Sequence, residues 1–273
     1  MCVRNWARSS PRRRRRSQHE RGNPAASRIA SGTLSSKVHI DFSRPIALFP
    51  LPTVVLYPHT FEWMVAFEPR YRQMVEDCLR ARGDGAILDA APIAMATYAG
   101  RSWPGERVGD PPLRPAVCVA KIVEHRPLPD GRHQILLHGF CRANIDVIAE
   151  PEGRRLYRLA RLSPIDRRAG APRRMPSLER ELSSIISRGE LGRWQQLEPV
   201  RNWLGRGNMP TDFVLEQLLN LLSRSDEMRY RMLAEPSGRS RARYALSELS
   251  HIGRMLDHAA ERGAEAQRGF TAN

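Results

Sequence analysis

The sequence predicts an α+β fold in which a mainly β part comes first and a helical part follows. Three observations predict it. Between residues 44 and 165, apolar side chains form short runs or alternate with polar ones, and both patterns are typical of strands. Beyond residue 176 they recur every three or four positions, which is the period of a helix. Residues 166–176 are rich in Arg, Gly and Pro, and this composition is typical of a linker between the two parts.

The first part is expected to open with short strands and one long helix. Residues 46–49 and 54–57 are apolar runs next to prolines, which limit them to short strands or strand ends. The alternation over residues 61–67 predicts a further strand. Pro69 then suits the first position of a helix, where a missing N–H costs nothing. The apolar face of this helix continues until glycines, beginning with Gly83, end it.

Further strands are expected up to residue 162. Apolar runs predict them at 86–88, 93–96, 116–123, 133–140, 141–149 and 156–162. The turn residues Pro129, Asp130 and Gly131 join two of these strands as a hairpin. In the strand at 141–149, one face of the sheet is expected to carry Ala143, Ile145 and Val147.

The second part is helical in period throughout. Helices are expected at 178–187, 194–204, 213–222, 225–233 and 240–260. Ser177, Thr211 or Asp212, and Ser225 are expected to cap the helices that they precede, because their side-chain oxygens can accept from free backbone N–H groups. The chain is therefore expected to divide into five segments: a disordered basic tail (1–43), a β-domain (44–165), a linker (166–176), a helical subdomain (177–262) and a flexible tail (263–273).

The positive charge is concentrated near the N-terminus. The chain of 273 residues has a net charge of +15. Residues 1–40 hold ten Lys or Arg and a single acid, Glu20, so they supply +9 of that charge. Only Lys37 and Lys121 are lysines, and the abundance of Arg fits a GC-rich genome better than a nucleic-acid site. The high charge therefore describes a tail more than a fold.

Cysteine usage and hydropathy indicate a cytoplasmic protein. The cysteines are Cys2, Cys78, Cys118 and Cys141, and none of them forms a CxxC pair, so free reduced thiols are expected. No apolar run approaches the roughly 20 residues that span a membrane, and the basic N-terminus is followed by no apolar stretch of a secretory signal. We therefore expect no membrane association.

Five strings in the chain are distinctive: IALFPLP (46–52), VVLYP (54–58), FEPRYRQMVED (67–77), PDGR (129–132) and ILLHG (135–139). Together they resemble the Lon protease N-terminal (substrate-binding) domain family. FEPRYRQM is the most specific of them, and the likeness covers about residues 44–258. The chain departs from the family pattern at His59, where the family usually has Gly, at residues 63–66, where an aliphatic run is usual, and at residues 100–115.

The resemblance implies a PUA-like β-barrel with one long helix, followed by a C-terminal helical bundle. It also implies that the chain recognises unfolded or exposed protein segments, as an adaptor or chaperone-like factor in protein quality control. Proteolysis is not expected: a Lon ATPase needs a phosphate loop, GxxxxGK[ST], and the sequence contains no Gly-Lys pair. We expect no catalytic residue, no cofactor and no metal, and the oligomeric state stays open.

Six residues are candidates for peptide binding: Trp63, Phe67, Glu68, Arg70, Tyr71 and Trp103. Aromatic alternation on a strand is more often core than groove, so Phe61, Trp63 and Phe67 are weighed toward the core. Structural roles are favoured for Glu68, as an acceptor of free helix N–H groups, and for Tyr71, by packing. Arg70 is expected to pair with an acid. Trp103 lies in a polar loop, where a large aromatic side chain is unusual.

RNA binding is the alternative function. It is motivated by Arg12 to Arg16, which could bind phosphates by counterion release, and by other users of PUA-like barrels. No aromatic side chains are interleaved with these arginines for base stacking, so the contact would lack specificity. His125, His133 and His138 fall on one hairpin but lack the convergent ligand set of a metal site.

Overall fold

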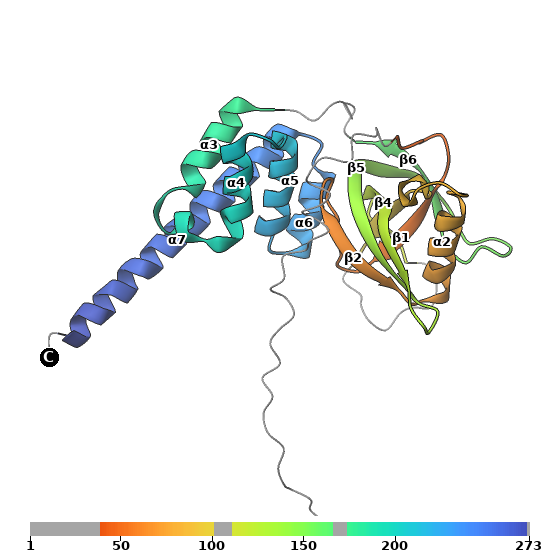
Figure 1. Cartoon of the computed structure of the whole chain (residues 1–273), viewed down its shortest axis with the longest axis horizontal. Coiled ribbons are helices and arrows are strands. Elements are labelled where there is room, and N and C mark those ends of the chain that lie inside the picture. Colours follow the sequence, from red (N-terminus) through yellow and green to blue (C-terminus); the bar gives the residue numbers. More distant parts are fainter. Residues whose placement is uncertain (1–38, 101–110, 166–173, 272–273) are drawn as a thin grey trace, which may run out of the picture. The chain divides into compact units, whose positions relative to one another are not determined.

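The computed structural model describes residues 39–100, 111–165 and 174–271, although side chains are described only as far as residue 262. The strands are β1 (Ile46–Leu51), β2 (Phe61–Ala66), β3 (Ile93–Thr97), β4 (Ala116–Pro127), β5 (His133–Ala149) and β6 (Leu159–Pro164). The helices are α2 (Pro69–Arg80), α3 (Pro176–Ile186), α4 (Glu198–Arg206), α5 (Thr211–Leu222), α6 (Asp226–Ala234) and α7 (Gly238–Thr271). The α+β class is confirmed (Figure 1).

The six strands form one sheet in the order β2-β5-β4-β3-β1-β6. The long strand β5 pairs along one edge with two partners, because its first half meets β2 and its second half meets β6. The pairing of β5 with β6 closes β5, β4, β3, β1 and β6 into a continuous circuit, and β2 stands outside that circuit. All neighbouring pairs are antiparallel except β1 and β3, which are parallel.

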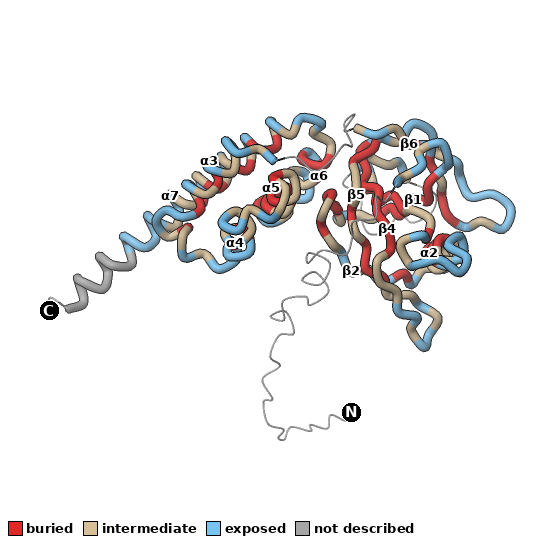
Figure 2. Tube along the Cα trace, turned by 45° about the horizontal axis from the view of Figure 1, so that its top comes forward, coloured by how far each residue is buried: buried red, intermediate tan, exposed pale blue. Residues whose placement is uncertain are grey.

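Helix α2 covers the main core of the sheet. Tyr71, Met74, Val75 and Cys78 recur along one face of the helix and are all buried. They join the cluster that contains Phe49, and the same cluster runs on into the helical part of the chain. A second, smaller cluster fills the other face of β1, β3 and β4. Figure 2 shows the buried stretches along β1, β4 and β5.

Buried polar contacts join the sheet to the helices. Arg142 on β5 donates to Glu216 on α5 (2.5 Å) and to the Leu233 carbonyl on α6 (3.1 Å). Arg241 on α7 lies 3.4 Å from the other oxygen of Glu216. We call Arg142, Glu216 and Arg241 the junction cluster. Its side chains are at most 8% exposed, so each charge is paired away from water.

Two further contacts strengthen this junction. The Tyr57 hydroxyl donates to the Arg229 carbonyl on α6 (2.8 Å), and burial raises the pKa of Tyr57 to about 12. The backbone N–H of Ala116, at the start of β4, donates to the Tyr230 hydroxyl (2.8 Å). Sheet and helices are therefore held together by backbone contacts as well as by buried charge.

Several sequence-based expectations about the β part are wrong in detail. The apolar run at 54–57 is not a strand, although Val55, Leu56 and Tyr57 are buried. Its chain turns so that Tyr57 and Thr60 can bond to each other (2.8 and 3.1 Å). The run at 86–88 belongs to a short 3-10 helix. Val147 is 49% exposed because the register between β5 and β6 shifts after Ile145, which moves Val147 off the buried face.

The helix ends also differ from expectation. Ser225 caps α6 through the Met228 N–H (3.2 Å), as predicted. Ser177 does not cap α3, because Pro176 already occupies the first turn and Met175 is the cap residue. Thr211 lies inside α5 and instead accepts from the Met175 N–H (2.7 Å) and donates to Glu179 (2.5 Å). Helix α7 extends to Thr271, beyond the expected helix end at residue 260. No described helix is long and apolar enough to cross a membrane.

Candidate functional site

Strands β2 and β5 carry aromatic side chains on the face that points away from the main core. Met64 on β2 packs against that core, and Ala66 belongs to it. The intervening residues therefore point the other way. From β2 and the residue after it, these outward-pointing side chains are Phe61, Trp63, Val65 and Phe67. Their neighbours on β5 are His138 and Phe140. We call these six residues the outer aromatic surface. Neither core cluster includes any of them.

Ring contacts organise the middle of this surface. The Phe61 ring stacks on the His138 ring with centroids 4.2 Å apart and planes at 10°. The Phe140 ring follows at 4.6 Å from His138, tilted by 56°. Nearby, the Arg126 guanidinium lies 5.4 Å from the centre of the Trp63 ring, and the same Arg126 pairs with Glu124. The surface thus offers π faces for stacking, with an ion pair at its margin.

The end of the outer aromatic surface is open to solvent. Phe67 is 56% exposed and Val65 is 39% exposed. The expectation that this aromatic alternation belongs to the core is therefore wrong for Phe67, and it holds only partly for Phe61 and Trp63, which are half-buried. The predicted alternation of side chains is confirmed, but the aromatic side chains lie on the face of the sheet that points away from the main core. Large exposed apolar side chains next to one another are suited to contact with another molecule.

His138 is neutral at physiological pH. Burial is the main cause that lowers the pKa of His138 to about 4, and the electrostatic interaction with nearby His59 lowers it further. Within the described part of the chain, its Nδ1 atom is buried and has no hydrogen-bond partner. A neutral ring stacked between Phe61 and Phe140 acts chiefly as a third aromatic side chain, and it costs an unmet hydrogen bond.

A second group of rings lies where the sheet meets α4 and α5. His59 has a φ of 63°, the left-handed conformation that glycine adopts freely. Its carbonyl accepts from Gln217 (2.6 Å), and its ring lies 6.1 Å from that of Phe213. Phe213 in turn packs edge-on against Trp203 at 5.0 Å. Burial lowers the pKa of His59.

Close backbone contact fixes His59 beside the outer aromatic surface. The His59 N–H donates to the Gly139 carbonyl (2.8 Å), and the Gly139 N–H donates to the Thr60 carbonyl (3.0 Å). A Cβ atom on residue 139 would lie 2.1 Å from the Tyr57 carbonyl oxygen, so only glycine allows this approach. Gly139 separates His138 from Phe140, which places the turn at residues 57–60 against the aromatic rings.

Glu68, Arg70 and Tyr71 form a separate group at the start of α2. Glu68 makes no side-chain cap bond, so the expected capping role is wrong. It pairs instead with Arg70 (2.9 Å), as was expected of Arg70. Tyr71 is buried, donates to the Pro50 carbonyl (2.9 Å) and packs at 4.6 Å on Phe49. Burial is the main cause that raises the pKa of Tyr71. These contacts are structural, and a binding role for the three residues stays a prediction.

The remaining sequence candidates divide by position. Trp103 and Arg12 to Arg16 lie outside the described residues. His125 and His133 meet (3.0 Å), and His133 contacts Glu76 on α2 (3.2 Å), whereas His138 lies apart on the other face. Among the described residues, no three His, Cys, Asp or Glu side chains are placed to hold a metal ion.

The sequence alone did not single out His138 and Phe140 as partners of Phe61. Leu136, His138 and Phe140 alternate on the strand that the Pro129 turn folds back, and this was the available signal. It could not be used without the β2–β5 register, because β2 and β5 are about 70 residues apart in the chain.

Comparisons with known proteins place the chain by sequence and by fold. The model of the ATP-dependent protease La (LON) substrate-binding domain matches residues 45–251. The N-terminal domain of a Mycobacterium avium complex Lon protease is similar in structure (TM-score 0.51, 12% identity), covering 76% of this chain and 98% of that one. A Lon N-terminal domain protein from Xanthomonas campestris gives a TM-score of 0.50 at 18% identity, with 75% and 98% covered. No curated protein matches.

Proposed function

Because the chain belongs to the LON substrate-binding domain family, we propose that it is a non-catalytic module that binds unfolded or exposed segments of other proteins. The family description supports a protein-binding role at the coarse level. The finer description, an adaptor or chaperone-like factor of the cytoplasm in protein quality control, is part of the proposal. So is the absence of catalysis, which is supported by the lack of a Gly-Lys pair for a phosphate loop.

The outer aromatic surface carries this proposal. Six neighbouring side chains are aromatic or aliphatic, and the exposed pair at one end, Val65 and Phe67, extends them into solvent. An unfolded segment exposes mixed apolar side chains without a fixed shape. Stacking and apolar contact suit such a ligand because neither demands one exact arrangement of donors and acceptors. The comparisons give no support to the RNA-binding alternative.

The proposed architecture follows from the same family. We interpret the closed circuit of strands as the PUA-like barrel of residues 44–165, and α3 to α7 as the helical bundle that follows it. The linker at 166–176 and the tail at 1–43 complete the division. In this arrangement, β2 and the turn before it lie at the boundary of the two parts, since His59 contacts α5.

A binding experiment with the full chain tests the proposed function. The probe is reduced and carboxymethylated lactalbumin, which cannot refold, and binding is measured by calorimetry and by crosslinking. We expect saturable binding, weakened about tenfold by Trp63→Ala, because truncation of a central aromatic anchor typically removes 1 kcal/mol or more. Met255→Ala on α7, a large apolar side chain that is 51% exposed, is the control and should leave the affinity unchanged.

Absence of binding to the unfolded probe by the unmodified chain would overturn the proposal. Unchanged affinity in the Trp63 variant would place binding elsewhere on the protein. A native, folded lactalbumin sample should bind more weakly, because its apolar segments are buried.

A further inference from the structure

Strand β2 is an open edge of the sheet. It pairs with β5 on one side, and no strand of the described residues pairs with it on the other. Most of the remaining strands are protected, because the circuit through β5 and β6 gives them two neighbours each. Figure 1 shows β2 beside β5, outside this circuit. An open edge presents backbone groups that can accept a further strand.

The register identifies which backbone groups point outward. The Gly139 N–H donates to the Thr60 carbonyl, and the pairing of Phe61 with His138 continues in that same register. Bonded and non-bonded pairs alternate in an antiparallel ladder. Residues 62, 64 and 66 therefore exchange bonds with β5, whereas Trp63 and Val65 direct their N–H and C=O groups to the open edge.

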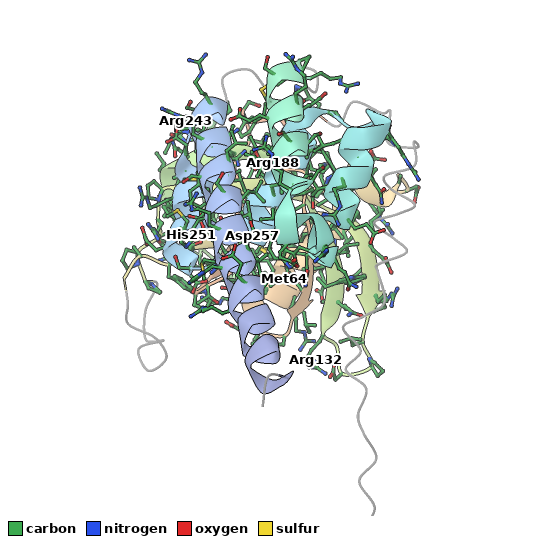
Figure 3. All side chains as sticks on the ribbon, turned by 90° about the vertical axis from the view of Figure 1, so that its left-hand side faces the viewer. Met64, Arg132, Arg188, Arg243, His251 and Asp257 are labelled. Atoms are coloured by element: carbon green, nitrogen blue, oxygen red, sulfur yellow. The ribbon has the colours of Figure 1, made fainter. Side chains whose placement is uncertain are left out.

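Two different sets of side chains flank that edge. On one face are Trp63 and Val65 of the outer aromatic surface. On the other face are Glu62, Met64 and Ala66. Met64, labelled in Figure 3, packs against the main core, whereas Glu62 is exposed. Glu62 has no hydrogen bond or ion pair with any described residue. Partial burial raises the pKa of Glu62, although Arg229 on α6 lowers it.

We propose that the edge of β2 takes an extended segment of a client protein as an added strand, with apolar residues beside Trp63 and Val65 and a basic residue beside Glu62. This rests on the proposed function and names the form and charge of its ligand. Main-chain bonds would supply affinity that does not depend on sequence, while alternate side chains would supply selectivity.

Charge complementarity selects this occupant over a second copy of the chain. A charged side chain among inward-facing positions of an edge strand guards it against pairing with a like strand. Two β2 strands paired edge to edge would bring two Glu62 carboxylates onto the same face. A segment with Lys or Arg at that position instead neutralises the carboxylate. Opposite charges on neighbouring strands stabilise the pairing, whereas like charges weaken it.

The ligand backbone is tested first, with the unmodified full chain. The probe is the acetylated peptide Thr-Val-Lys-Val-Thr-Val, labelled with a fluorophore and measured by anisotropy. Methyl groups are placed on its backbone nitrogens one at a time. We expect affinity to fall about fivefold or more at every second position and to stay unchanged between, because only alternate N–H groups of an added strand face the edge. A uniform loss, or none, would overturn the proposal.

The protein side is tested with matched variants. Val65→Pro removes an outward N–H without removing a β2–β5 bond, and proline is tolerated on edge strands. It should weaken peptide binding about fivefold, whereas Val65→Thr, which keeps the N–H and the β-branched shape, should not. Replacing the peptide Lys by Glu should weaken binding about two- to fivefold. Glu62→Lys should reverse that preference, and a preference that ignores residue 62 would overturn the assigned face.

The outcomes separate this inference from the proposed function. If unfolded lactalbumin binds and Trp63→Ala weakens it, but the methylation pattern has no period of two, then the module binds clients by another mode. If sedimentation shows a dimer that Val65→Pro dissociates, the edge is occupied by a second copy and the inference is wrong.

Discussion

The junction cluster and the outer aromatic surface are both built by side chains outside a simple apolar core, but one is closed and the other is open. Arg142 is 1% exposed and donates to Glu216 and to the Leu233 carbonyl, and Arg241 lies beside the same Glu216. Phe67 is 56% exposed, and the buried Nδ1 of His138 has no partner within the described residues. Buried charges lie beside opposite charges in the first region, while aromatic residues are incompletely covered in the second.

This difference indicates which region holds the molecule together and which is available to a partner. A buried charge is tolerated only where its partners replace water, so the junction cluster must stay assembled for the sheet and helices to remain joined. An exposed aromatic group carries no such requirement. Its removal changes what the surface can bind, with little effect on folding.

The largest effect is expected from Glu216→Ala. This change leaves Arg142 and Arg241 buried without their carboxylate and should lower the free energy of unfolding by about 3–5 kcal/mol. Urea denaturation measures it. The control is Glu190→Ala, which breaks the solvent-exposed pair with Arg193 (2.6 Å) and should cost at most about 1 kcal/mol. Equal costs would show that the junction cluster does not differ from a surface pair.

An intermediate effect is expected from acid. The pKa of His138 in the folded protein, about 4, lies below its ordinary value of 6.5, so protonation favours the unfolded chain. The stability from neutral His138 is complete above about pH 6.5 and is lost as the pH falls toward 4. The loss is up to about 3 kcal/mol. His138→Phe should flatten this part of the pH dependence in urea titrations, whereas the exposed His251→Phe should not. An unchanged slope in His138→Phe would contradict the assignment.

The smallest effect on stability is expected from Phe67→Ser. The exposed ring contributes little to folding, so the free energy of unfolding should change by no more than about 0.5 kcal/mol. The affinity for reduced and carboxymethylated lactalbumin should nevertheless fall several-fold. Met255→Ser is the matched control on α7, because it removes an equally exposed apolar side chain and should change neither quantity. A fall in stability with unchanged affinity would reverse the roles assigned to the two regions.

The comparison also shows where sequence patterns are informative. Helix α2 could be predicted from the spacing of Tyr71, Met74 and Cys78, because a periodic apolar face and a proline at the start are local signals. The strand predicted at 54–57 is wrong, because a continuous apolar run indicates burial and does not show whether the backbone is extended. The cap residue of α3 was misassigned because Pro176 competes with Ser177 for the first turn.

The sequence by itself determined the α+β class, the long helix after residue 68, the hairpin at Gly131 and the likeness to the family that the LON model later matched. These features depend on neighbours within a few residues, or on strings that can be read directly. Only the tertiary structure decided that Phe61 stacks on His138, that Glu216 lies between two arginines and that β2 stands outside the closed circuit. Each of these depends on a pairing register or a packing contact between distant residues, and no local pattern encodes such a contact.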